Sequence, residues 1–184
     1  MKKLQLLLFI IPLLCLKANS QNIYKSTDGT VSFFSETPVE NIDAENKTLT
    51  SLLNINTGEI AFLVTNNGFK FDKPLMEEHF NENYIESDKY KVSSFKGKIT
   101  GELLDYAKDG TYKVKAKGIL DMHGVEKERE IDGTITVKDG KISISCEFDI
   151  LLKDHKIKIP KIVTEKIAES VLVQVNINLA PKTK

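Results

Sequence analysis

Residues 141–150 read KISISCEFDI, and polar and apolar side chains alternate through this stretch without a break. Successive side chains of a β-strand point to opposite faces of its sheet, so the stretch predicts a strand with one buried and one solvated face. Residues 171–179, VLVQVNINL, repeat the pattern with only Leu172 out of place. Two long segments with a period of two indicate an all-β protein.

The same alternation predicts six further strands, which makes eight in all. Their joints contain the dipeptides Thr57-Gly58, Asp109-Gly110, His123-Gly124 and Asp139-Gly140, and glycine adopts the positive φ of a tight hairpin turn at little cost. Consecutive strands are therefore expected to pair antiparallel. The six strands are expected near residues 30–36, 47–55, 59–66, 90–103, 111–122 and 125–137.

Residues 72–87 interrupt the strands. Met76, Phe80 and Tyr84 recur every four residues in this stretch, and Pro74 suits a first helical turn. The sequence therefore predicts one inserted α-helix.

Strands of ten or more residues leave long edges with unpaired backbone groups, which can pair with other chains, unless the sheet closes on itself. An eight-stranded barrel has an interior just wide enough for packed side chains or one small ligand. We therefore expect an eight-stranded antiparallel barrel with one inserted helix. A β-sandwich is the alternative, although sandwich strands are usually shorter and their turns more closely spaced.

Residues 118–127, GILDMHGVEK, resemble the strand-turn segment G-x-L-x-[ILM]-H-G-V-x-K of the YceI-like family. The run Glu78-His79-Phe80 is similar to the helical segment of that family, and residues 171–179 fit its last strand. The resemblance covers nearly the whole chain after residue 20. It implies a lipocalin-like barrel with an apolar tunnel that holds a polyisoprenoid or another lipid.

Two positions depart from the family pattern. Lys91 stands where the family usually has proline, and Glu77-Glu78 stands where it has an Arg-Asp pair. The shared motifs are mostly structural, so they imply a fold and a lipid pocket and name no particular ligand.

Small residues on the inner face of the barrel, such as Ala116, Gly118 and Cys146, would leave room that Leu or Phe would fill. The alternative is that they match large residues across a filled core. The resemblance favours the cavity. The residues expected to line it are Phe62, Val64, Val114, Ala116, Gly118, Leu120, Ile144, Cys146, Phe148, Val173 and Val175.

A two-residue turn at residues 123–124 would place Gly118 opposite Arg129 and would aim Arg129 and Lys127 inward. We hypothesise that Arg129, helped by Lys127, binds an anionic group of the ligand, such as a carboxylate or phosphate. A bulge between Arg129 and Ile131 is the alternative, and it would turn both cations to solvent.

Signs of catalysis and of metal or cofactor binding are weak. His79, His123 and His155 lie far apart and belong to no metal-binding motif, and no glycine-rich phosphate loop is present. Cys146 lies mid-strand, where a buried thiol behaves as a small apolar group. We therefore predict a binding protein without catalytic residues, metal or cofactor.

Two alternatives stay open. The first is an isomerase-type enzyme that uses His79 or His123 as its acid–base group, which requires one of them to face the cavity near a carboxylate. The second is a structural or interaction protein with a filled core.

The first twenty residues read as a secretory signal peptide. Two lysines precede an apolar stretch of 13 residues, Leu4–Leu16, and residues 18–20 form a small-x-small cleavage site. We expect cleavage before Gln21, one domain over residues 21–184, and a periplasmic or secreted protein. A helix that spans a bilayer needs about 20 apolar residues, so no stable membrane anchor is predicted. Cys15 would be the acylated residue of a lipoprotein alternative.

The balance of charges limits the classes of partner that are expected. The chain has 26 basic and 26 acidic residues, and loss of residues 1–20 leaves 23 basic residues against 26 acidic ones. This balance argues against the extended basic surface that contacts with nucleic-acid phosphates require, so no nucleic-acid partner is expected. Cys146 would be the single cysteine after cleavage, so no internal disulfide is expected. The expected partner is a polyisoprenoid, quinone-like or fatty lipid, and the oligomeric state is left open, a dimer included.

Overall fold

The computed structural model of the protein describes residues 22–101 and 104–182. The expected signal peptide, its cleavage site and Cys15 lie outside the described residues. In the part of the chain that is described, no helix is long and apolar enough to cross a membrane.

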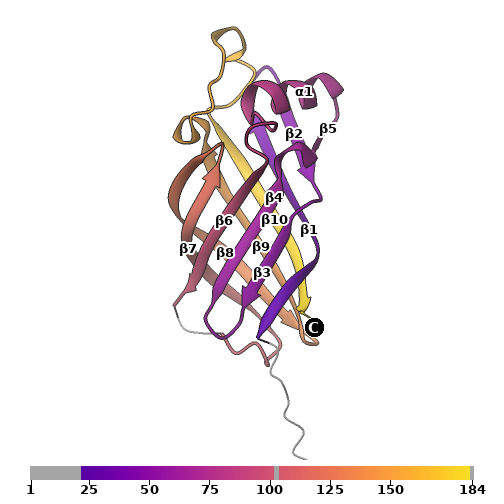
Figure 1. Ribbon diagram of the computed structural model, residues 1–184, viewed down its shortest axis with the longest axis vertical. Coiled ribbons are helices and arrows are strands. Elements are labelled where there is room, and N and C mark those ends of the chain that lie inside the picture. The colour runs from indigo at the N-terminus through magenta and orange to yellow at the C-terminus, as the bar shows by residue number, and fades with distance from the viewer. Residues whose placement is uncertain (1–21, 102–103, 183–184) are drawn as a thin grey trace, which may run out of the picture.

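Eight antiparallel strands close into a barrel (Figure 1). The sheet closes because the first strand pairs with the last along almost its whole length, from Tyr24 opposite Pro181 to Phe34 opposite Leu172. The predicted eight-stranded antiparallel barrel is thus confirmed, and its closure excludes the sandwich alternative. The barrel strands are β1 (Ile23–Glu36), β3 (Thr50–Asn54), β4 (Glu59–Thr65), β6 (Val92–Thr100), β7 (Gly110–Met122), β8 (Val125–Lys138), β9 (Lys141–Leu151) and β10 (Ser170–Pro181).

Two short strands that the sequence analysis missed extend the sheet at the upper end of Figure 1. β2 (Asn41–Asn46) pairs with the upper half of β1, and β5 (Phe69–Phe71) pairs with β2. β2 has only two apolar residues and β5 has only three residues, so neither gives a clear alternating pattern. β1 begins at Ile23, earlier than the predicted start near residue 30. The first half of this strand was not predicted because it is mostly polar.

The inserted helix is shorter than predicted. α1 (Pro74–His79) begins with the expected proline in its first turn and passes into one π-helical turn, η2 (Phe80–Tyr84). Phe80 anchors this segment to the barrel, because its ring packs against Phe33, Phe69 and Phe71 with centroids 5.2 to 5.5 Å apart. The helix therefore lies across the upper end of the barrel, where it borders the interior.

Two hairpins turn through residue pairs with positive φ, as predicted. His123 and Gly124 have φ of 54° and 68°, and Asp139 and Gly140 have φ of 50° and 72°. These turns match the twist of the flanking strands. The Asp109-Gly110 pair does not have these positive φ angles, and Gly110 is already the first residue of β7.

The turn at residues 123–124 fixes the register between β7 and β8. Gly118 lies opposite Arg129, as expected, and the pairing continues without a shift to Ala116 opposite Ile131. The alternative of a bulge between Arg129 and Ile131 is therefore wrong.

Candidate ligand cavity

The upper part of the barrel encloses a cavity of about 530 Å³. Small-molecule sites usually measure about 300 to 1,000 Å³, so the space suits one ligand. The inner faces of the barrel strands line it, and α1, η2 and residues 152–167 contribute lining side chains at the upper end. A completely filled core is therefore excluded.

The cavity is elongated. Along β7 its lining residues run from Val114 to Met122, which is about 26 Å of strand at roughly 3.3 Å per residue. Below this level the barrel is solid. The side chains that fill its lower end are almost completely buried, and none of them lines the cavity: they are Leu53, Val137, Ile142, Ile177 and Leu179.

Ten of the eleven residues predicted to line the cavity do so. Their contact with a ligand stays a prediction. The ten are Phe62, Val64, Val114, Ala116, Leu120, Ile144, Cys146, Phe148, Val173 and Val175.

Gly118 is the exception. A Cβ atom at this position would lie 2.3 Å from the Lys96 carbonyl oxygen and 2.5 Å from the Gly97 Cα atom. The space beside Gly118 is therefore occupied by the backbone of β6, and the glycine serves a close approach of two strands instead of making room for a ligand.

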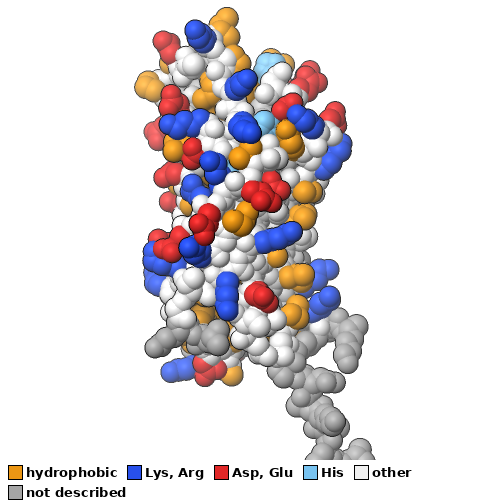
Figure 2. All heavy atoms as spheres, turned by 60° about the vertical axis from the view of Figure 1, so that its left-hand side comes forward, with side chains coloured by type: hydrophobic (Ala, Val, Ile, Leu, Met, Phe, Trp, Pro, Cys, Tyr) orange, Lys and Arg blue, Asp and Glu red, His pale blue; other side chains and the backbone are white. Residues whose placement is uncertain are grey.

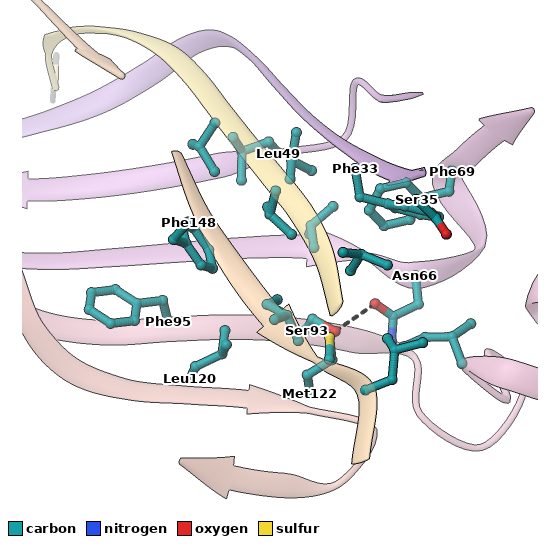
Figure 3. A pocket seen from close by; sticks show the side chains of 18 of the residues that line it. Phe33, Ser35, Leu49, Asn66, Phe69, Ser93, Phe95, Leu120, Met122 and Phe148 are labelled. Carbon is teal, nitrogen blue, oxygen red and sulfur yellow. Dashed lines mark hydrogen bonds between the residues drawn. The ribbon is translucent and has the colours of Figure 1, made fainter. Parts of the chain in front are cut away.

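The sequence analysis missed the aromatic part of the lining. Phe33, Phe69, Phe71 and Phe80 form a cluster at the upper end of the cavity. Figure 3 shows Phe33 and Phe69 of this cluster. Phe33 could have been found, because it falls in an expected strand and shares the parity of Val31. Phe69 and Phe71 lie on β5, which was not predicted. Because no strand was expected there, their alternation with Lys70 did not indicate that the two rings face inward.

Small side chains widen the middle of the cavity. Cys146 lies opposite Gly133 on β8 and opposite Val175 on β10. Burial raises the pKa of the Cys146 thiol to about 11, so the group is neutral at ordinary pH. A neutral thiol behaves as a small apolar side chain, and the strands leave open space at this level.

One polar group is built into the apolar wall. Asn66 is almost completely buried, and its Nδ2 donates to the Tyr90 carbonyl oxygen at 2.7 Å. A carbonyl can only accept, so this bond fixes the amide orientation. Asn66 Oδ1 then accepts from the Ser93 hydroxyl at 2.8 Å (Figure 3). Because Ser93 uses its proton in this bond, its oxygen can only accept from a ligand.

Ser35 is a second buried hydroxyl in the lining. Its Oγ accepts from the backbone N–H of Ala168 at 2.9 Å, which ties the segment before β10 to β1. The Ser35 proton takes no part in that bond, so this hydroxyl is able to donate to a ligand. The mostly apolar wall thus includes one hydroxyl that can accept from a ligand and one that can donate to it. Further polar side chains in the lining are Glu40, Lys73, His79, Tyr84, Ser94 and Lys166.

Arg129 and Lys127 do not line the cavity. The Arg129 guanidinium donates through Nη2 to the Asp149 carbonyl oxygen on β9, while Lys127 is exposed. Backbone pairing of β8 with β9 covers only Gly133–Lys138, so Arg129 bridges the two strands where they separate. Anion binding by these two residues stays a prediction that the geometry does not favour.

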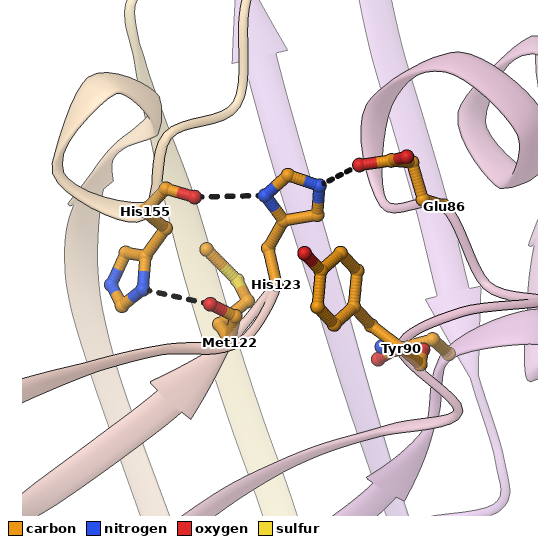
Figure 4. A network of polar contacts seen from close by, with 6 residues as sticks. Glu86, Tyr90, Met122, His123 and His155 are labelled. Carbon is orange, nitrogen blue, oxygen red and sulfur yellow. Dashed lines mark hydrogen bonds and ion pairs between the residues drawn. The ribbon is translucent and has the colours of Figure 1, made fainter.

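A network of polar contacts joins three segments of the chain beside the cavity (Figure 4). His123 Nδ1 lies 2.9 Å from the His155 carbonyl oxygen, and His123 Nε2 lies 2.6 Å from Glu86 Oε2. The carbonyl can only accept, so Nδ1 donates, and Nε2 forms an ion pair with Glu86 when the ring carries both protons. The Tyr90 ring packs on His123 with centroids 4.5 Å apart. The turn between β7 and β8 is thereby joined to the segment after η2 and to the turn at residues 152–155.

His155 is buried in the same network. Its Nδ1 donates to the carbonyl oxygens of Met122 and Val125, at 3.2 and 3.1 Å. Burial is the main cause that lowers the pKa of His155 below its usual value, and the nearby Arg129 charge lowers it further. This imidazole is therefore a structural donor that favours the neutral form.

The enzyme alternative required a histidine that faces the cavity near a carboxylate. His79 lines the cavity, while the carboxylate contact belongs to His123, which does not line it. The two conditions thus fall on different residues. Within residues 22–101 and 104–182, no group of three His, Cys, Asp or Glu side chains is placed to hold a metal ion.

A family model described as a YceI-like domain matches residues 18–179. A search of curated proteins found no match.

Solved structures share the fold at low identity. A polyisoprenoid binding domain from Saccharophagus degradans has a TM-score of 0.74 at 14% identity, covering 86% of this chain and 98% of that one. Burkholderia cenocepacia BcnA has a TM-score of 0.70 at 11% identity, covering 82% and 95%. The Campylobacter jejuni YCEI protein has a TM-score of 0.62 at 16% identity, covering 81% and 90%.

Proposed function

Because the chain belongs to the YceI-like domain family, we propose that it binds one elongated lipid in its barrel and carries or sequesters it. The observation that supports this most directly is the apolar cavity of about 530 Å³ that runs along the inner faces of the strands. A related fold is described as a polyisoprenoid binding domain, which agrees with a ligand of this shape.

The proposed ligand has an apolar chain and one small polar end. The chain lies along Val114, Cys146 and Phe148, where the wall offers no hydrogen-bonding side chain. The polar end lies in the upper half, where Ser93 can accept a hydrogen bond and Ser35 can donate one. A ligand hydroxyl can donate to Ser93 or accept from Ser35, and a quinone or carboxyl oxygen can accept from Ser35. An isoprenoid alcohol, a quinone-like lipid and a fatty acid therefore fit the site.

We also propose that the protein acts after export, in the periplasm or outside the cell, as residues 21–184. The basis is the signal-like sequence of the first twenty residues. A carrier in such a compartment shields an insoluble chain from water. Export is checked by expressing the full chain and determining the N-terminal residue of the purified protein, which should be Gln21.

The test of ligand binding is to purify residues 21–184 under mild conditions, extract the protein with organic solvent and identify lipids by mass spectrometry. Cys146→Phe should abolish the co-purifying lipid, because the larger ring occupies the middle of the cavity. Ser145→Phe is the matched control, because the neighbouring side chain is exposed on the outer face of β9. Recovery of a stoichiometric lipid from Cys146→Phe, or of none from the parent protein, would argue against the proposal.

A further inference from the structure

Exposed apolar side chains gather around the mouth of the cavity. The three most exposed large apolar residues among those described are Ile162 at 92%, Leu75 at 60% and Val39 at 58%. They belong to the segment between β9 and β10, to α1 and to the loop between β1 and β2, which all lie at the upper end (Figure 1). Single exposed apolar residues are ordinary, whereas a group of them at one end of a molecule indicates an interaction site.

The segment between β9 and β10 is also basic. Residues 152–168, here called the basic lip, contain five lysines and only two acidic residues, in a chain whose charges balance overall. All five lysines are exposed, and none takes part in the ion pairs found among the described residues. Figure 2 shows lysine and apolar side chains next to one another at this end. The lysines are Lys153, Lys156, Lys158, Lys161 and Lys166.

The basic lip is continuous with the cavity. Val163, Lys166 and Ile167 line the mouth, while Ile162 points away from it into solvent. The other side of the mouth has the opposite charge, because Glu78 and Glu82 are exposed on α1 and η2. A negatively charged surface would therefore attract one side of the mouth only.

We propose that the basic lip docks on an anionic lipid bilayer, with Ile162 in the headgroup region and the lysines against the lipid charges. An exposed apolar side chain beside lysines is the combination that binds such an interface. Docking places the mouth against the membrane, so that the ligand passes between bilayer and cavity without crossing water. The route of transfer rests on the proposed function, whereas docking itself is measured without any ligand.

The experiment is sedimentation of the protein with vesicles of phosphatidylcholine alone and with phosphatidylglycerol added. A tag at the end of β10 leaves the mouth free, because that end lies opposite the basic lip. The parent protein should sediment with the anionic vesicles only, and its binding should weaken as salt rises. No binding to anionic vesicles at low salt would overturn the proposal.

Two variants test the basic lip. Ile162→Ser and the double variant Lys158→Glu with Lys161→Glu should each weaken binding to anionic vesicles by about tenfold or more. None of these residues lines the cavity. The matched controls are Ile119→Ser on the barrel wall, and Lys138→Glu with Lys141→Glu at the opposite end, where these lysines face each other across a turn. Equal losses in variants and controls would overturn the proposal.

Retention of a radiolabelled isoprenoid alcohol, measured by co-elution without vesicles, separates the two proposals. Variants of the basic lip that retain the alcohol but no longer sediment with anionic vesicles support docking as a separate step. If the parent protein holds neither the alcohol nor a radiolabelled quinone or fatty acid tested in the same way, yet still docks through the basic lip, the proposed function fails and docking stands. If Cys146→Phe loses the alcohol and docks like the parent, both proposals are supported.

Discussion

Cys146 reports directly on the environment of the cavity, because its thiol is a titrating group in the apolar wall. Its pKa of about 11 lies above the value of about 8.5 for a free cysteine, since burial disfavours the thiolate. Between these two pH values the folded protein holds a proton that the unfolded chain has lost. The contribution of Cys146 to stability is therefore full below about pH 8.5 and is lost as pH rises toward 11.

We predict that alkylation of Cys146 in the protein of residues 21–184 is slow at pH 8 and accelerates about tenfold per pH unit up to about pH 11. The reason is that only the thiolate reacts, and its fraction grows with pH below the pKa. The measurement is the rate of iodoacetamide labelling by mass spectrometry, with the urea-unfolded chain as control. A plateau near pH 8.5 in the folded protein would contradict burial of the thiol.

His155 gives the opposite dependence. Its pKa is lowered in the folded protein, mainly by burial, so below about pH 6.5 the unfolded chain binds a proton that the folded protein does not. Stability from this residue is full above about pH 6.5 and is lost as pH falls. We predict that urea unfolding of His155→Asn depends less on pH between 7.5 and 5 than unfolding of the parent. The exposed His79→Asn is the control, and equal pH slopes in His155→Asn and the parent would show that the buried imidazole is not the cause.

The face or strand position of Cys146 and Arg129 could be predicted from the sequence, whereas the contacts of these side chains could not. Cys146 was expected on the inner face because alternation fixes the face of a strand residue. His155 belongs to no motif, and nothing in its local sequence indicates that it is buried and bonded to the carbonyl oxygens of Met122 and Val125. Arg129 was placed correctly opposite Gly118, but the bond from its guanidinium to Asp149 depends on where two strands separate. Contacts of that kind come from tertiary structure.

The pairing of β6 with β7 depends on two facing glycines. Gly97 lies opposite Gly118, and a Cβ atom on Gly118 would approach the Lys96 carbonyl oxygen to 2.3 Å. The backbone of β6 would have to move to accept any side chain at Gly118. The two strands can lie this close only because both positions lack Cβ atoms.

We predict that Gly118→Ala destabilises the protein by about 3 kcal/mol or more, the magnitude typical of severe strain in a packed interior. Gly133→Ala is the control, because the nearest atom to its new Cβ would be the Ser145 carbonyl oxygen at 3.2 Å, and its other two neighbours would be at 3.4 and 3.9 Å. It should cost less than about 1 kcal/mol. Urea unfolding measures both values, and similar losses would mean that backbone crowding is not the role of Gly118.

Elements were predictable where one pattern extends over many residues. β7 to β10 have long alternating runs, and their expected bounds nearly match the observed ones. β2 and β5 are too short to show a period, and they form because the upper half of β1 offers an edge to pair with. The α-helix passes into a π-helical turn at Phe80, whose ring packs against Phe33 and the other rings. These elements were missed or misjudged because distant partners define them.

At the scale of the whole molecule, one barrel combines a solid lower end with a hollow upper end. Ile142 and Ile144 lie on the same strand, face the same way and are both buried, yet only Ile144 lines the cavity. Their local patterns are identical, so alternation could predict an interior but not which part of it is filled. The difference depends on how side chains from all eight strands meet at each level.

This division predicts unequal costs for one chemical change made at two levels. Leu53, with 0% of its surface exposed, lies in the solid end, and Leu120 lies in the cavity wall with open space on one side. Leu53→Ala should destabilise the lipid-free protein by about 3 to 5 kcal/mol, because it removes contacts on every side and leaves a void. Leu120→Ala should cost about 1 to 2 kcal/mol, since part of its surface has no protein partner to lose. Urea unfolding of delipidated protein tests both, and a bound lipid should raise the cost of Leu120→Ala by restoring the missing contacts. Equal losses at the two positions without lipid would mean that the upper barrel is packed as tightly as the lower end.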